Sequence, residues 1–115
     1  MAVTIYHNPR CSKSRQTLAL LQERGVDPKV VEYLQDTPDA EDLDSILKKL
    51  NMEPRDLMRR KETLYKEQGL DDPGLDRETL IAAMVEHPIL IERPIVMNDG
   101  KAALGRPPEK VLEIL

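Results

Sequence analysis

The feature of this sequence that most constrains its fold is a strand–helix–strand pattern near the N-terminus. Val3–Tyr6 is a short run of β-branched and aromatic residues, which predicts a strand. An amphipathic helix carrying Leu18 and Leu21 follows and is expected to end near Gly25. Val30–Tyr33 predicts a second strand. Because a helix connects them, the two strands are expected to pair in parallel.

The middle of the chain is predicted to be helical. Thr37 and Pro38 form a start signal in which Pro38 suits the first helical position, and the leucine and isoleucine side chains that follow recur at helical spacing. A second helical stretch is expected from about Pro54 through Arg60, with Gln68 as its farthest end. After a loop that contains two glycines, Asp76 is expected to cap a third helix.

The C-terminal part returns to strands. Ile95–Met97 and Ala102–Leu104 flank the turn residues Asn98–Gly100, a pattern that predicts a β-hairpin. Pro107–Pro108 is expected to start a last helix.

The order of these elements predicts the fold class. A βαβ unit, a helical insertion over about residues 37–87 and a ββα unit predict one α/β domain across residues 1–115. No repeat or low-complexity run divides the sequence. Around one mixed sheet, this order matches the thioredoxin and glutaredoxin layout, in which a reactive cysteine lies between the first strand and the first helix.

The only cysteine, Cys11, falls at this junction, in the first turn of the predicted helix. The unpaired N–H groups and the dipole at a helix N-terminus favour a thiolate and bind anions, and Lys13 and Arg15 add positive charge. The alternative is a buried structural cysteine, but the polar, turn-forming neighbours of Cys11 favour a nucleophile. Ser14 stands where a Cys-x-x-Cys motif has its second thiol, so a redox cycle requires an external thiol.

Two polar residues near Cys11 have alternative interpretations. Ser14, one helical turn further on, can hydrogen-bond the thiolate or a bound oxyanion, or it can cap the first turn of the helix. His7, at the end of the first strand, can influence the protonation of Cys11, or it can have a packing role.

Arginine residues are the second candidate site feature. Arg93 interrupts an apolar run, a position that requires a charged partner or a functional role. Arg93 and Arg106 flank the predicted hairpin, and guanidinium groups bind tetrahedral oxyanions in a bidentate manner. Arg59 and Arg60, taken alone, indicate a solvated helix face. In thioredoxin-like folds the position of Pro94 holds a cis-proline that faces the reactive cysteine.

Composition excludes several other classes. A formal net charge of −4 argues against a general nucleic-acid binder, and one cysteine cannot form an internal disulfide. Two histidines and one cysteine lack the spacing of a metal site, and no glycine-rich phosphate loop is present. No signal or membrane-spanning segment is visible, so the cytoplasm is the expected compartment.

Four separated motifs cover essentially the whole chain, and together they resemble the ArsC family of glutaredoxin-coupled arsenate reductases, in particular its short bacterial subgroup. The motifs are His7–Arg15 with Thr17 and Leu18; Arg55, Leu57, Arg59 and Tyr65; His87–Val96; and Gly105–Pro108.

The resemblance implies a role for each site residue. Cys11 would attack arsenate, and Arg59, Arg93 and Arg106 would bind the resulting thiol-arsenate adduct. Arg59 is chosen over the adjacent Arg60 because of its spacing within the second motif. Glutathione would then attack the adduct, and glutaredoxin would recycle the mixed disulfide at Cys11, with arsenite as the product. The expected protein is a monomer without a bound cofactor or metal.

Two alternatives remain open from the sequence. Longer family members commonly have Gly-Thr-Ser after the cysteine, whereas Ser12, Lys13 and Ser14 follow it here, and the charge of Lys13 can alter which oxyanion or thiol is preferred. The first alternative is therefore another glutathione- or glutaredoxin-coupled thiol oxidoreductase. The second is a regulatory binding protein of the Spx type, but the redox switch of such regulators requires a second cysteine where this chain has Ser14.

Overall fold

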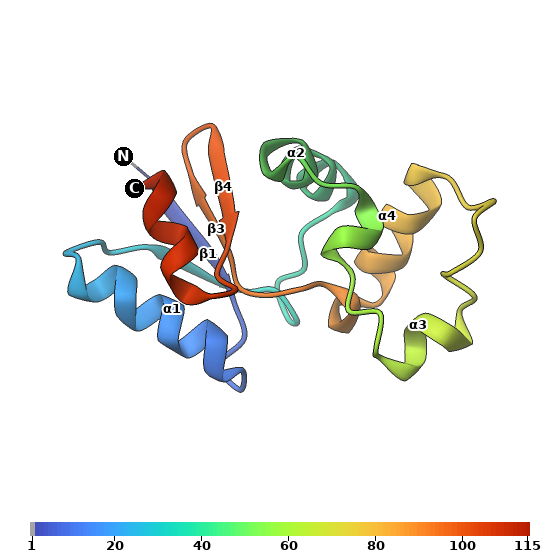
Figure 1. The fold of residues 1–115 in the computed structure, drawn as a ribbon, viewed down its shortest axis with the longest axis horizontal. Helices are drawn as coiled ribbons and strands as arrows, with labels where there is room; N and C mark the ends of the chain where they lie inside the picture. The colour runs from blue at the N-terminus through green and yellow to red at the C-terminus, as the bar shows by residue number, and fades with distance from the viewer. Residues whose placement is uncertain (1) are drawn as a thin grey trace. The chain divides into compact units, whose positions relative to one another are not determined.

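The computed structural model describes residues 2–115, which form two compact units (Figure 1). The first unit combines the N-terminal segment up to Asp36 with Arg93–Leu115, and the second is Thr37–Glu92. Cys11, Arg93 and Arg106 therefore belong to the first unit, and Arg59 belongs to the second.

The first unit is built on a four-stranded mixed sheet in the order β2-β1-β3-β4. β1 pairs in parallel with β2 and antiparallel with β3, and β3 pairs antiparallel with β4. This topology confirms the predicted βαβ and ββα halves. The elements of the unit are β1 (Val3–His7), α1 (Ser12–Glu23), β2 (Lys29–Glu32), β3 (Ile95–Asn98), β4 (Lys101–Leu104) and the 3-10 helix η3 (Pro108–Ile114).

The core of the first unit forms where the alternate residues of β1 meet the helices. Val3 and Ile5 point to the buried side of the strand, and Ile5 is opposite Val96 in β3. Leu21 of α1 and Val111 of η3 complete the buried cluster. α1 and η3 lie side by side in Figure 1. Burial of these aliphatic side chains fixes the end of β1, and with it the loop that carries Cys11.

The second unit is helical. In it α2 packs against α4, and their buried leucine, isoleucine and methionine side chains form its core. Its elements are α2 (Ala40–Leu50), the 3-10 helix η1 (Pro54–Leu57), α3 (Thr63–Glu67), α4 (Arg77–Glu86) and the 3-10 helix η2 (Pro88–Leu90). Asp76 caps α4 by accepting a hydrogen bond from the Thr79 N–H at 2.8 Å, as predicted.

The predicted start of α2 is wrong by two residues. Pro38 does not occupy the first helical position, because Asp39 is the N-cap and the helix begins at Ala40. The carboxylate of Asp39 accepts from the Asp42 N–H at 2.8 Å, and the Asp42 carboxylate accepts from the Asp39 N–H at 3.3 Å. This capping box gives hydrogen-bond acceptors to the N–H groups of Asp39 and Asp42. A helix that began at Pro38 would not have this pair of hydrogen bonds.

The helical stretch predicted from about Pro54 through Arg60, with Gln68 as its farthest end, is not continuous. It is divided into η1 and α3, because Met58 adopts an extended conformation and forms an isolated β-bridge with Ile91. The last helix begins as predicted after Pro107, but it is a 3-10 helix throughout. β2 lies one residue earlier than predicted, at Lys29–Glu32.

Within residues 2–115, no helix is both long enough and apolar enough to cross a membrane. In the same part of the chain, no cluster of three or more histidine, cysteine and carboxylate side chains is arranged to hold a metal ion.

Candidate active site

Cys11 lies at the N-terminal end of α1, where a short loop connects it to β1. It is the N-cap residue, with an extended backbone (φ −94°, ψ 123°), so α1 itself begins at Ser12. Its N–H donates to the Asn8 carbonyl at 3.0 Å, and its carbonyl accepts the first helical hydrogen bond from the Arg15 N–H at 3.0 Å. Its side chain is half-buried. The sulfur is therefore accessible at the positive end of a twelve-residue helix.

The pKa of the Cys11 thiol is lowered from its ordinary value. Burial raises the pKa, but the backbone N–H groups of Ser14 and Lys13 and the guanidinium of Arg93 hydrogen-bond to the sulfur and lower it further than burial raises it. The positive charge of Arg93 adds to this effect. The first turn of α1 contains no acidic residue that would oppose it. These contacts stabilise a thiolate, the form of cysteine that acts as a nucleophile.

The loop before Cys11 is held by three hydrogen bonds to side chains. The Asn8 side-chain oxygen accepts from the Arg10 N–H at 3.0 Å, and the Asn8 N–H donates to Ser14 Oγ at 3.0 Å. Arg15 donates from Nη1 to the Pro9 carbonyl at 2.9 Å. Arg15, predicted as a supporting residue, thus contacts the loop that precedes Cys11.

Ser14 and His7 contact each other beneath this loop. Ser14 is fully buried, His7 is 6% exposed, and Ser14 Oγ lies 2.6 Å from His7 Nδ1. The hydroxyl of Ser14 therefore binds His7 and Asn8, while its backbone N–H binds the Cys11 sulfur. Burial lowers the pKa of His7, the charge of Glu32 raises it and that of Arg15 lowers it, with a net decrease. The lowered pKa favours the neutral imidazole.

Arg93 and Arg106 are in contact with each other in the first unit. Arg93 hydrogen-bonds to the Cys11 sulfur, and the Arg93 carbonyl accepts from Arg106 Nη1 at 3.2 Å. Arg59 belongs to the second unit, where its guanidinium pairs with Glu62 at 2.7 Å and with Glu92 at 3.7 Å. Two of the three predicted arginines are therefore placed with Cys11 in one unit.

A tightly packed corner supports Arg93 and Arg106. The Arg93–Pro94 peptide bond is cis, as the fold predicts for Pro94, and the Arg106–Pro107 bond is also cis. Gly105 donates from its N–H to the Pro94 carbonyl at 2.9 Å. A Cβ at Gly105 would overlap with Thr17 Oγ1 and lie 2.8 Å from Pro94 Cγ. Only glycine allows this close approach.

Sequence reasoning did not identify the structural roles of Gly105 and Thr17. Both stand within the motifs of the ArsC resemblance, but nothing in their local sequence shows that they meet. Thr17 is fully buried, and its hydroxyl donates to the Lys13 carbonyl at 2.8 Å. The contact joins two segments that are far apart in sequence, so only the folded chain shows it.

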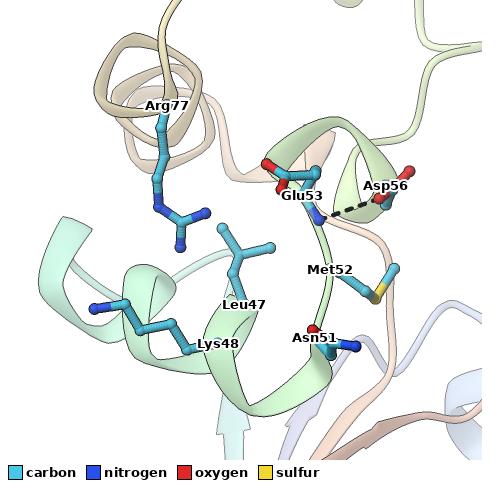
Figure 2. A pocket seen from close by; sticks show the side chains of 7 residues that line it. All are labelled: Leu47, Lys48, Asn51, Met52, Glu53, Asp56 and Arg77. Carbon is cyan, nitrogen blue, oxygen red and sulfur yellow. Dashed lines mark hydrogen bonds between the residues drawn. The ribbon is translucent and has the colours of Figure 1, made fainter.

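A cavity of about 350 Å³ lies in the second unit, and none of the predicted site residues lines it (Figure 2). Arg77 extends from α4 into it and pairs with the Asp44 carboxylate at 2.8 Å. The dashed line in Figure 2 marks the hydrogen bond from the Glu53 N–H to Asp56 at 3.1 Å. Because Arg77 and Asp56 are engaged in structural contacts, we assign no chemistry to this cavity.

The fold and the site of the first unit together define a class of protein. A thioredoxin-like mixed sheet presents one low-pKa cysteine at the junction of β1 and α1, opposite a cis-proline loop with an arginine bound to the sulfur. This is a thioredoxin-like fold with a single cysteine at the start of its first helix, in surroundings that favour the thiolate.

Comparison with known proteins identifies the family: the chain belongs to the ArsC family, whose model matches residues 6–114. It is 60% identical to the uncharacterized protein YfgD of Escherichia coli, over 98% of this chain and 96% of that protein. It is 53% identical to a Haemophilus influenzae protein named arsenate reductase, over the full length of both. Among solved structures, that of the arsenate reductase from Vibrio cholerae has a TM-score of 0.98 at 56% identity, covering 100% of this chain and 98% of that one.

Proposed function

We propose that this protein reduces arsenate to arsenite, with Cys11 as the nucleophile and Arg93 and Arg106 as ligands of the oxyanion. The observation that carries the proposal is the Cys11 sulfur, which two backbone N–H groups and the Arg93 guanidinium stabilise as a thiolate. The names of the relatives in Haemophilus influenzae and Vibrio cholerae support arsenate as the substrate.

The first chemical step is attack of the Cys11 thiolate on arsenic(V). A sulfur–arsenic bond forms, and one oxygen of arsenate takes up a proton and leaves as hydroxide or water. The guanidinium groups of Arg93 and Arg106 carry donors that match the remaining arsenate oxygens. Donors fixed before the reaction stabilise the negative charge that develops on those oxygens.

The second step requires an external thiol, because Cys11 is the only cysteine of the chain. Glutathione is the thiol that we propose. Its sulfur attacks Cys11, the sulfur–arsenic bond breaks with its electron pair on arsenic, and arsenite is released with a glutathione disulfide at Cys11. Glutaredoxin then attacks the glutathione sulfur and returns the Cys11 thiolate, so two thiols supply the two electrons.

The remaining parts of the proposal come from the family resemblance. Arg59 is the third expected oxyanion ligand. Its guanidinium pairs with the carboxylates of Glu62 and Glu92, so its role as a ligand stays a prediction. We propose that the protein acts as a monomer in the cytoplasm, where the glutathione and glutaredoxin pools keep thiols reduced. No bound cofactor is part of the proposed cycle.

The test is arsenate-dependent oxidation of NADPH in the presence of glutathione, glutaredoxin and glutathione reductase. Wild type is expected to turn over, and Cys11→Ser is expected to have no activity. Arg93→Ala and Arg106→Ala should each lose about ten- to a hundred-fold in kcat/KM, the effect of removing a hydrogen bond to a charged group. Arg24→Ala is the control, because this exposed arginine lies at the opposite end of α1.

Absence of turnover by the wild-type protein would refute the assignment if Cys11 still reacts as a low-pKa thiol with an alkylating reagent. That result would favour the alternative of another glutathione-coupled thiol oxidoreductase. Loss of activity in Arg24→Ala equal to that in Arg93→Ala would show that the arginine effects are not specific to the site.

A further inference from the structure

A small cavity lies beside the loop that carries Cys11, and the reaction steps above make no use of it. Its volume is about 150 Å³. One wall is the end of β1 and the following loop, His7–Arg10, and the other is Glu32 at the end of β2 with Leu34 and Gln35 in the turn that follows. All of these residues belong to the first unit.

The two walls carry opposite charges. Arg10 and Glu32 are both exposed, and within residues 2–115 neither side chain forms an ion pair with another residue. Glu32 is opposite His7 in the register of β1 and β2, so the two strands bring this carboxylate to the same cavity as the loop. A cation and an anion that share one cavity match a zwitterion, with its carboxylate at Arg10 and its ammonium at Glu32.

The other lining residues suit an amino-acid head group. The side-chain amide of Gln35 can donate and accept hydrogen bonds, and Leu34, which is 43% exposed, offers an apolar contact for methylene groups. A cavity of about 150 Å³ is smaller than the roughly 300–1,000 Å³ of sites that enclose a whole small molecule, so it fits one end of a ligand. An oxyanion without an ammonium group would be repelled by Glu32.

The cavity is also close to the nucleophile. Arg10 directly precedes Cys11, and consecutive Cα atoms are about 3.8 Å apart. A ligand with its zwitterionic head between Arg10 and Glu32 is therefore held beside the loop that ends at Cys11.

We propose that this cavity is the subsite for the γ-glutamyl head of glutathione, with the α-carboxylate bound by Arg10 and the α-ammonium by Glu32. Bound in this way, glutathione presents its sulfur to Cys11. The inference rests on the proposed function, in which glutathione is the thiol that reacts at Cys11.

The test measures thiol–disulfide exchange at Cys11 without arsenate. The Cys11 thiolate attacks one sulfur of glutathione disulfide, the disulfide bond breaks, a mixed disulfide with Cys11 forms, and the second glutathione leaves as a thiolate that is protonated by water. The rate is followed by mass spectrometry for wild type, Arg10→Gln and Glu32→Gln. The same rates are measured with bis(2-hydroxyethyl) disulfide, which lacks a head group, and with N-acetylated glutathione disulfide, which lacks the ammonium.

The expected result is a selective loss. Each variant should react about tenfold more slowly with glutathione disulfide and within about twofold of wild type with the hydroxyethyl compound. With the N-acetylated compound, Glu32→Gln should match wild type, because the group that Glu32 binds is already absent. Glu23→Gln, which removes an exposed carboxylate at the far end of α1, should react like wild type with all three compounds.

Two results would overturn the proposal. Equal losses with glutathione disulfide and the hydroxyethyl compound would show a general effect on thiol reactivity, including one transmitted through His7. Unchanged rates with glutathione disulfide would show that the cavity does not bind it. Because the exchange requires no arsenate, it tests the subsite even if the arsenate assay fails. If arsenate is reduced, both variants should raise the KM for glutathione and leave the KM for arsenate unchanged.

Discussion

Replacement of Gly105 by alanine tests the packing that supports the two site arginines. The added Cβ would overlap with Thr17 Oγ1, lie 2.8 Å from Pro94 Cγ and lie 3.1 Å from Thr17 Cγ2. Thr17 and Pro94 are both buried, so neither can move its side chain into solvent. Excess side-chain volume in a packed interior lowers the free energy of unfolding by about 1–3 kcal/mol. Two of these contacts are shorter than those that Cβ atoms form in real structures. We therefore expect a loss in the upper part of this range, about 2–3 kcal/mol.

The change should be visible as a fall in the unfolding temperature. At about 2.1 cal/mol/K per residue, the unfolding entropy of 115 residues is about 0.24 kcal/mol/K, so the shift is about 8–12 °C. Urea unfolding followed by circular dichroism measures the free energy directly. Gly100→Ala is the matched control, because a Cβ there has no heavy atom within 4 Å. Its free energy of unfolding should stay within about 0.5 kcal/mol of wild type.

A double-mutant cycle with Thr17→Ala tests the cause. That change removes both Thr17 atoms near the new Cβ but leaves Pro94 Cγ in place. The double variant should therefore be about 1 kcal/mol more stable than the sum of the single effects predicts. If Gly105→Ala is as stable as Gly100→Ala, or if the two changes are additive, the proposed overlap does not limit stability.

Three further predictions follow from other contacts. Burial raises the pKa of Cys11 and Arg93 lowers it, so Arg93→Gln should move the pH profile of iodoacetamide alkylation to higher pH, and an unchanged profile would contradict the assigned contact. Because the folded-state pKa of His7 is lowered, the unfolded chain binds more protons as pH falls through about 6.5, and stability should decrease there. Urea midpoints between about pH 7.5 and about pH 5.5, one unit on either side of that value, should show a smaller decrease in His7→Gln than in wild type. Asp39→Ala should cost about 1 kcal/mol through loss of the cap of α2, and an unaltered urea midpoint would show that the capping box adds nothing.

The elements of the first unit could be predicted because their signals are local. The β-branched and aromatic run Val3–Tyr6, the helical spacing in α1 and the turn residues before β4 are each contained in a few neighbouring residues. The position of Cys11 at the start of α1 followed from the same signals. The cis bond before Pro94 could be expected only from the fold, because the dipeptide itself does not show it.

The errors arose where a distant segment or a competing cap decides the local structure. Met58 leaves the helical conformation because it pairs with Ile91, which no local pattern indicates. Asp39 starts α2 in place of Pro38 because two reciprocal hydrogen bonds stabilise that start. The fit of Gly105 against Thr17 likewise depends on segments far apart in the chain.

The use of main-chain donors at the sulfur has a consequence for how such a site can evolve. The N–H groups of Lys13 and Ser14 lower the pKa of Cys11 whatever side chains those residues carry, unless a proline replaces them. Position 13 is exposed and can therefore vary without loss of the thiolate, whereas position 14 is restrained by the bonds of its hydroxyl to His7 and Asn8. Single substitutions at position 13 can thus change the charge beside the nucleophile while the main-chain hydrogen bond to its sulfur is kept.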